Sequence, residues 1–87
     1  MTSSTWTVDV ALDESGGTTR AQVRLDAGTG TFTGIGLVRG GPRGVHLPEI
    51  AAELAIARAF SDLTEELLEA VASDIEAQSR PPLAAAR

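Results

Sequence analysis

The chain has 87 residues, contains no cysteine and no lysine, and carries a formal net charge of −5. A chain of this length forms one small domain that buries only about 60% of its unfolded surface, so a partner that covers more apolar surface would stabilise it. The absence of cysteine excludes disulfides, thiolate catalysis and cysteine-ligated metal sites. No run of about 18 apolar residues and no signal-peptide pattern occurs, which favours a cytoplasmic protein without a membrane span.

The first segment with a strand pattern comprises residues 5–13. Its apolar and polar residues alternate strictly, which is typical of a strand with one buried face. Residues 14–17 follow with two glycines and predict a hairpin turn, because glycine adopts the positive φ angles that such turns need. The apolar members of the strand are Trp6, Val8, Val10 and Leu12.

Two further strand patterns follow, at residues 20–26 and 31–39, with a glycine-rich turn between them. The second strand alternates apolar and charged residues, whereas Gly34 and Gly36 interrupt the third. Glycine inside a strand commonly marks a bulge or the close approach of another backbone. We therefore expect a helix or a second subunit to lie over these two glycines. The apolar residues of the second strand are Ala21, Val23 and Leu25.

A long amphipathic segment predicts a helix that begins at Pro48 and ends before Pro81 and Pro82. About thirty helical residues reach about 45 Å, whereas a nine-residue strand spans about 30 Å. Either the helix breaks near Ser61, where Asp62 resembles a capping residue, or its surplus packs on another chain. We favour the break. The expected core stripe is Ile50, Leu54, Ala57, Phe60, Leu63, Leu67, Val71 and Ile75.

These patterns predict an α+β fold, in which a three-stranded antiparallel meander precedes a long C-terminal helix. Residues 5–80 form the single domain, and residues 1–4 and 81–87 are expected to be disordered tails. The whole net charge lies on the helical part, because eight acidic residues from Pro48 onward face three arginines. We interpret this acidity as a solvated helix face, and an acidic surface for a basic partner is the alternative.

Hydroxyl and carboxylate side chains are many, but the sequence contains no recognisable catalytic motif. His46 is the only histidine, and its pairing with Glu49 lacks the third ligand of a metal site. The glycine-rich segment fits no dinucleotide fingerprint, since Arg39 stands at the last glycine position, and no P-loop, since Pro42 replaces the lysine. No Gly-x-Ser-x-Gly motif occurs. The sequence thus predicts a protein that is not an enzyme and has no metal, cofactor or small-molecule substrate.

Four arginines form the one candidate contact site. Arg20 and Arg24 share the polar face of the second strand, Arg39 ends the third strand, and Arg43 lies in the loop that follows. One guanidinium group can donate two parallel hydrogen bonds to the oxygens of a phosphate. These four arginines are therefore a candidate site for contact with RNA, a ribosome or another partner. Two features count against RNA binding. The chain is acidic overall, and its only tryptophan, Trp6, suits a core position better than base stacking.

The helical run Glu-Leu-Ala-x-Ala-Arg-Ala-x-Ser-Asp-Leu, residues 53–63, resembles a family of small actinobacterial proteins, the domain-of-unknown-function family numbered 1876. The resemblance extends to the third-strand segment 33–39 and to the opening residues 6–10, so it covers nearly the whole chain. It departs at residues 39–43, where relatives are expected to have a turn with less glycine.

The resemblance implies a fold like that of the double-stranded-RNA-binding domain, in which a helix precedes the three strands. This chain lacks that first helix, so a partner subunit is expected to supply one in a homodimer. Ribosome-hibernation factors have a comparable layout of helix and meander. No RNA-contact or catalytic residue is carried over from the family.

We therefore predict a non-enzymatic, homodimeric domain that acts in protein interaction or as a stress-state accessory factor. The alternative is a ribosome- or RNA-associated protein, similar to a hibernation factor, that uses the arginine-bearing face of the sheet.

Overall fold

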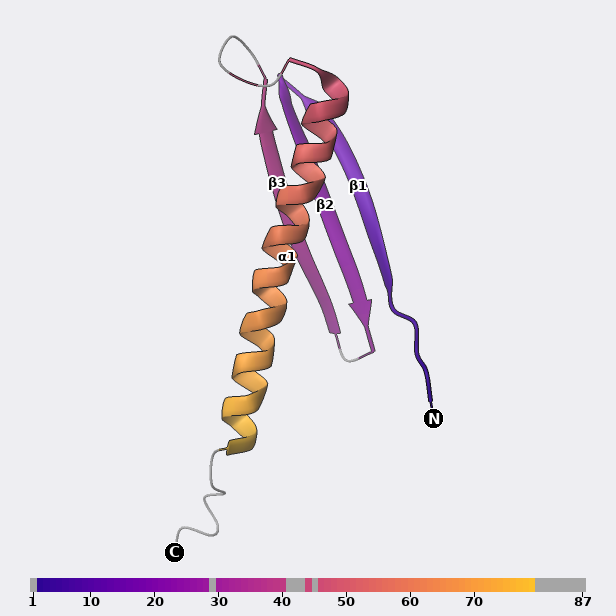
Figure 1. Cartoon of the computed structure of the whole chain (residues 1–87), viewed down its shortest axis with the longest axis vertical. Coiled ribbons are helices and arrows are strands. Elements are labelled where there is room, and N and C mark those ends of the chain that lie inside the picture. The colour runs from indigo at the N-terminus through magenta and orange to yellow at the C-terminus, as the bar shows by residue number, and fades with distance from the viewer. Residues whose placement is uncertain (1, 29, 41–43, 45, 80–87) are drawn as a thin grey trace, which may run out of the picture.

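A computed structural model describes residues 2–28, 30–40, 44 and 46–79. Strands β1 (Thr7–Ser15), β2 (Thr18–Ala27) and β3 (Gly30–Arg39) form an antiparallel sheet in chain order, and one helix, α1 (Pro48–Ser79), follows (Figure 1). The predicted α+β fold is confirmed, although β1 begins two residues later than expected. Residues 2–4 have no regular secondary structure, and the other predicted tail, 81–87, lies outside the described residues.

The turn between β1 and β2 sets the register of the sheet. Gly16 and Gly17 have φ angles of +58° and +79°, as a two-residue hairpin turn requires. The resulting pairing places Val10 opposite Val23, and Val23 opposite Gly34. Because directly opposite residues project to the same side of a sheet, these three positions share the face on which α1 lies.

The helix approaches this face closely over the two glycines of β3. A Cβ atom added to Gly36 would collide with the backbone of Ala55 and Ala59, and one added to Gly34 with the backbone of Ala59 and Leu63. The expectation that a helix lies over these glycines is confirmed. The buried core consists mainly of small side chains: Ala21, Val23, Leu25, Val38, Ala51, Ala55, Ala59 and Leu63.

The predicted core stripe of α1 is largely wrong. Of its members only Leu63 is buried, while Leu54 and Leu67 pack partly against the core. The physical reason is the close approach, because a helix backbone in contact with a glycine strand leaves room for alanine but not for isoleucine or phenylalanine. The larger residues consequently lie on other sides of the helix. The exposed members of the predicted stripe are Ile50, Ala57, Phe60, Val71 and Ile75.

The predicted break near Ser61 is also wrong, because α1 is continuous through all 32 of its residues. Asp62 does not cap a second helix, and its Oδ2 atom accepts a hydrogen bond from the backbone nitrogen of Ile35 at 2.9 Å. A helix of this length reaches about 48 Å, and a ten-residue strand about 33 Å. The C-terminal part of α1 therefore extends past the sheet (Figure 1).

The close contact predicts a large effect of Gly36→Ala. The added methyl group meets helix backbone, so we expect a loss of about 1–3 kcal/mol in the free energy of unfolding, as for other overpacked cores. Urea unfolding followed by circular dichroism measures this loss. Gly30→Ala in the same strand is the matched control, since nothing lies within 4 Å of its Cβ position. Equal losses in the two variants would contradict the role assigned to Gly36.

Candidate functional site

Three of the four predicted contact arginines lie on the sheet face away from α1. The register sets Arg20, Arg24 and Arg39 on that face, because each has the opposite parity to the buried core positions of its strand. Arg20 and Arg24 are four residues apart along β2, a separation of about 13 Å between their backbones. Arg43 lies outside the described residues. The three arginines are therefore on one face but do not form a tight cluster.

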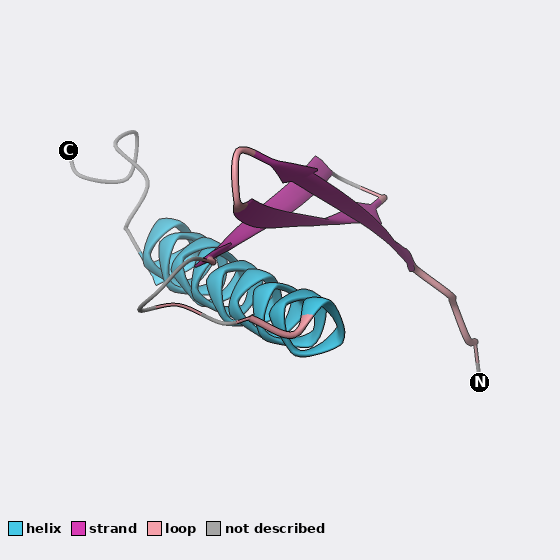
Figure 2. Ribbon diagram, turned by 90° about the horizontal axis from the view of Figure 1, so that it is seen from above, coloured by secondary structure: helices cyan, strands magenta, loops and turns pink. Residues whose placement is uncertain are grey.

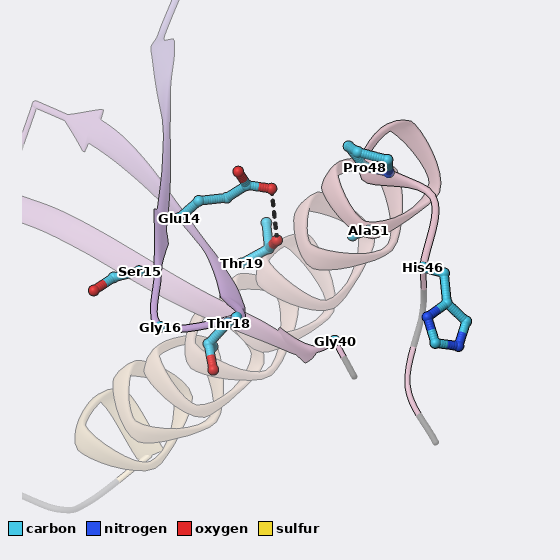
Figure 3. Close-up of a pocket in the computed structure, with 10 residues that line it drawn as sticks. Glu14, Ser15, Gly16, Thr18, Thr19, Gly40, His46, Pro48 and Ala51 are labelled. Carbon is cyan, nitrogen blue, oxygen red and sulfur yellow. Dashed lines mark hydrogen bonds between the residues drawn. The ribbon is translucent and has the colours of Figure 1, made fainter. Parts of the chain in front are cut away.

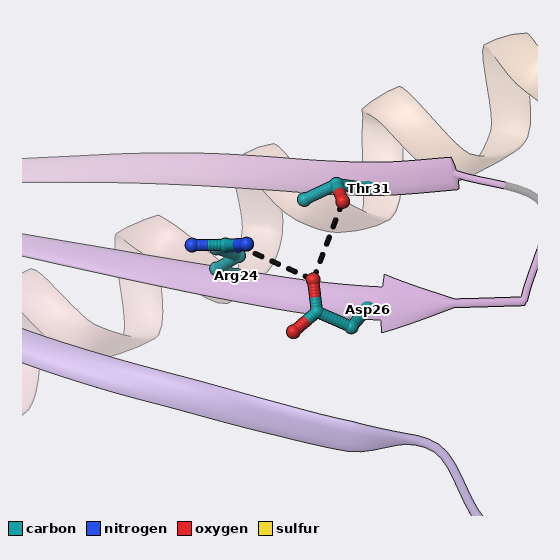
Figure 4. A network of polar contacts seen from close by, with 3 residues as sticks. All are labelled: Arg24, Asp26 and Thr31. Carbon is teal, nitrogen blue, oxygen red and sulfur yellow. Dashed lines mark hydrogen bonds and ion pairs between the residues drawn. The ribbon is translucent and has the colours of Figure 1, made fainter.

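Carboxylates are interleaved with these arginines. Arg24 Nε donates to Asp26 Oδ1 at 3.3 Å, and the same oxygen accepts a bond from Thr31 Oγ1 at 3.3 Å (Figure 4). The register also sets Asp9 opposite Arg24 and Asp13 opposite Arg20. An exposed pair of this kind stabilises the fold by at most about 1 kcal/mol. Its larger consequence is that the face offers alternating charges to a ligand, with no excess of positive charge.

The single histidine lies at a depression of about 450 Å³ between the first hairpin and the start of α1 (Figure 3). Glu14 also lines it, and there Thr19 Oγ1 donates to Glu14 Oε2 at 3.4 Å. The exposed His46 makes no hydrogen bond within the described part of the chain. In the same part, no group of three or more histidine and acidic side chains is placed to hold a metal ion.

An uncovered row of apolar side chains belongs to β1. Its side chains on the helix side of the sheet have the same parity as the core of β2, but α1 packs on β2 and β3 (Figure 2). The exposed fractions are 37% for Val8, 46% for Val10 and 50% for Leu12, and that of the preceding Trp6 is 57%. We call these four residues the β1 face.

Sequence reasoning assigned the β1 face to the core and missed its exposure. The width of the sheet could have revealed this exposure. Three strands about 4.8 Å apart form a surface that is wider than one helix about 10 Å across can cover. Once Gly34 and Gly36 fix the helix over β3, the strand farthest from it stays bare. No described helix is both long and apolar enough to cross a membrane.

The two edges of the sheet differ as well. At the β3 edge, side chains of α1 occupy backbone groups: Asp62 accepts from the Ile35 nitrogen, and Arg58 Nη1 donates to the Leu37 oxygen at 2.6 Å. Such contacts block the addition of another strand. Among the described residues, no side chain makes an equivalent hydrogen bond to the backbone of β1. The open side of the molecule therefore combines a free strand edge with the β1 face.

These features define a small α+β domain whose candidate site is an apolar surface rather than a catalytic cleft. The chain belongs to the Rv2632c-like family, which it matches over residues 4–84. A solved relative, the crystal structure of Rv2632c, superposes with a TM-score of 0.84 at 39% sequence identity, covering 94% of this chain and 98% of the relative.

Mycobacterial relatives show the same similarity in sequence. "Uncharacterized protein Mb1767" of Mycobacterium bovis is 44% identical over 77 residues, which are 88% of this chain and 82% of the relative. "Uncharacterized protein Rv2632c" of Mycobacterium tuberculosis is 41% identical over 76 residues, which are 87% and 82% of the two chains. Membership of a family found in actinobacteria is thus established, and these names assign no activity.

The contact between Asp62 and the β3 edge predicts a measurable loss in Asp62→Ala. A hydrogen bond to a charged acceptor contributes about 1.5–3 kcal/mol, so we expect the free energy of unfolding to fall by about 1–2 kcal/mol relative to the control Asp74→Ala. Asp74 is exposed in the same helix, so it corrects for the difference in helix propensity. Chemical unfolding at fixed protein concentration gives both values, and equal losses would show that the Asp62 contact contributes nothing.

Proposed function

We propose that the protein is a non-enzymatic, homodimeric interaction domain that serves as an accessory factor. The β1 face carries this proposal, since it exposes three branched aliphatic side chains and the only tryptophan of the chain next to the core. Contiguous exposed apolar surface of this kind is typical of protein–protein contact sites. The alternating charges of the opposite face offer no comparable binding surface.

The energetic scale also favours association through the β1 face. Fully burying a valine or leucine side chain stabilises by about 1.5–3 kcal/mol, so the half-exposed members of the β1 face each have roughly 1 kcal/mol still to contribute. A domain of this size has a total stability of only about 5–10 kcal/mol. Covering the β1 face would therefore change the stability of the fold substantially.

The finer assignments depend on the sequence resemblance. A likeness to family 1876, to the double-stranded-RNA-binding fold and to the layout of hibernation factors supports a role in a cytoplasmic stress state.

Contact with RNA or a ribosome is the second proposal, and its support is the shared face of Arg20, Arg24 and Arg39. Binding that depends on phosphate contacts strengthens steeply as salt falls. Because carboxylates flank these arginines, we expect the protein to remain in the supernatant when lysate ribosomes are sedimented at low salt. Co-sedimentation of the wild-type protein that is lost in Arg24→Glu would instead favour the RNA-binding function.

The homodimer makes a direct prediction for Val10→Lys. A lysine in the β1 face adds a charge that must be desolvated on association, so we expect the mass in sedimentation equilibrium to fall from about twice 9.0 kDa to that of the monomer. Ala11→Lys is the matched control, because Ala11 projects to the opposite face between Asp9 and Asp13. Circular dichroism checks that both variants are folded. At a protein concentration of about 100 µM, even a weak dimer with a micromolar Kd would be largely associated. A wild-type protein that is monomeric at this concentration overturns the proposal.

A further inference from the structure

One row of backbone groups on β1 points away from the rest of the sheet. The hairpin at Gly16 and Gly17 is closed by the pair of Ser15 and Thr18, and the closing pair of a two-residue hairpin is hydrogen-bonded. Because hydrogen-bonded and non-hydrogen-bonded pairs alternate along antiparallel strands, the odd-numbered residues of β1 bond to β2. The N–H and C=O groups of the even-numbered residues therefore point outward: Val8, Val10, Leu12 and Glu14.

The same alternation accounts for the backbone contacts at the other edge. Ala27 and Gly30 close the turn between β2 and β3, so the odd-numbered residues of β3 point outward. Two of these, Ile35 and Leu37, are the residues whose backbone groups bind side chains of α1. The helix therefore occupies the β3 edge, whereas β1 is the strand farthest from α1 and keeps its outward groups open (Figure 2).

We propose that two copies of the chain join through this edge, with β1 of one copy antiparallel to β1 of the other. This inference rests on the proposed homodimer and adds the strand through which it forms. Proteins protect exposed edges with prolines, lysines, bulges or charges. β1 has no proline and no lysine, and it pairs with β2 without a bulge. Its carboxylates Asp9 and Asp13 lie opposite Arg24 and Arg20, which weakens the protection they give.

The acidic residues of β1 restrict the register of this pairing. The outward groups of the two strands must face each other, so the two-fold axis passes through a residue of β1. An axis at Ala11 would set Asp9 opposite Asp13 of the other copy, and an axis at Asp9 would set that residue opposite itself. Like charges directly opposite each other destabilise a sheet. An axis at Val10 avoids both pairs, because Asp9 then faces Ala11 of the other copy.

The apolar residues of β1 favour the same register. With the axis at Val10, this residue faces its own equivalent, and Val8 faces Leu12 of the other copy. An axis at Leu12 would instead set the carboxylate of Glu14 opposite Val10, and axes nearer the ends of β1 would pair fewer residues. The register centred on Val10 is therefore the one that matches apolar with apolar side chains and keeps the carboxylates apart.

The two copies then form one continuous sheet. The two-fold axis is perpendicular to this sheet, so both helices lie on the same side of it. Each helix packs on β2 and β3 of its own copy (Figure 2), so the two β1 strands separate the helices and they do not collide. On that side of the sheet, Val8 of one copy and Leu12 of the other lie about 5 Å apart at their Cβ atoms. These side chains thus gain neighbours at the edge where a single copy provides none.

Disulfide formation tests the pairing, because the chain has no cysteine of its own. Asp9 and Ala11 of different copies form a non-hydrogen-bonded pair with Cα atoms about 4.5 Å apart, within the range of a disulfide. We expect Asp9→Cys/Ala11→Cys to give a disulfide-linked dimer with copper phenanthroline as oxidant, seen in non-reducing denaturing electrophoresis. Thr31→Cys/Thr33→Cys is the matched control, since these residues have the same spacing on the same face of the other edge strand, and it should stay monomeric.

Ala11→Cys alone tests the register. With the axis at Val10, the two copies of residue 11 are diagonal neighbours about 7–8 Å apart, which is too far for a disulfide. A covalent dimer of Ala11→Cys alone places the axis at Ala11 and overturns the register. No covalent dimer from Asp9→Cys/Ala11→Cys, while the wild-type protein sediments as a dimer, overturns the edge pairing and leaves the homodimer standing. A monomeric wild-type protein removes the homodimer and the edge pairing together.

Val10→Pro supplies a second test without thiols. Proline removes the outward N–H of residue 10, and an edge strand tolerates proline where its N–H faces solvent. We expect Val10→Pro to stay folded by circular dichroism and its mass in sedimentation equilibrium to fall from about twice 9.0 kDa to that of the monomer. Val10→Thr is the matched control, since it keeps the N–H and the branched shape, and it should remain dimeric. A folded Val10→Pro that stays dimeric, or a monomeric Val10→Thr, shows that side chains and not edge hydrogen bonds hold the dimer, and overturns the inference.

Discussion

The contact between the backbone of α1 and the glycines of β3 determines the rest of the structure. Gly34 and Gly36 have no Cβ, so the helix backbone reaches the strand itself, and only small residues fit where they meet. Ala55 and Ala59 occupy that position and are fully buried. Close packing of small groups gains many dispersion contacts without filling a wide space. One narrow contact thus fixes the helix over one side of the sheet.

The polar contacts of the helix reinforce this placement. Asp62 and Arg58 are one turn apart on α1, and they bind the nitrogen of Ile35 and the oxygen of Leu37, two residues apart on the outer strand. A helix held at the β3 edge in this way cannot also cover β1. The exposure of Val10 is therefore a consequence of how the core is built and not a local irregularity of β1.

The alternation of apolar residues and the glycines at turns were sufficient to predict all three strands, and Pro48 predicted the start of the helix. The buried side of the helix was not predictable in the same way, because large apolar residues ordinarily mark the core and here they face outward. Gly34 and Gly36 indicate which side of the helix is buried, because a helix that packs closely on two glycines has room only for small residues such as alanine. For the candidate site, the shared face of Arg20 and Arg24 followed from spacing, whereas the carboxylates beside them depended on register.

Helix α1 carries apolar residues on more than one side, with small residues on one side and larger residues on the others. In this chain the side with small residues packs on the sheet of the same chain, because only it can approach Gly36. The larger residues, such as Leu68 and Ile75, stay 63% and 60% exposed, because they lie on sides of the helix that the sheet of the same chain does not reach. The helix is also longer than its sheet, and in the described part of the chain the last residue of α1 that packs on the core is Leu67.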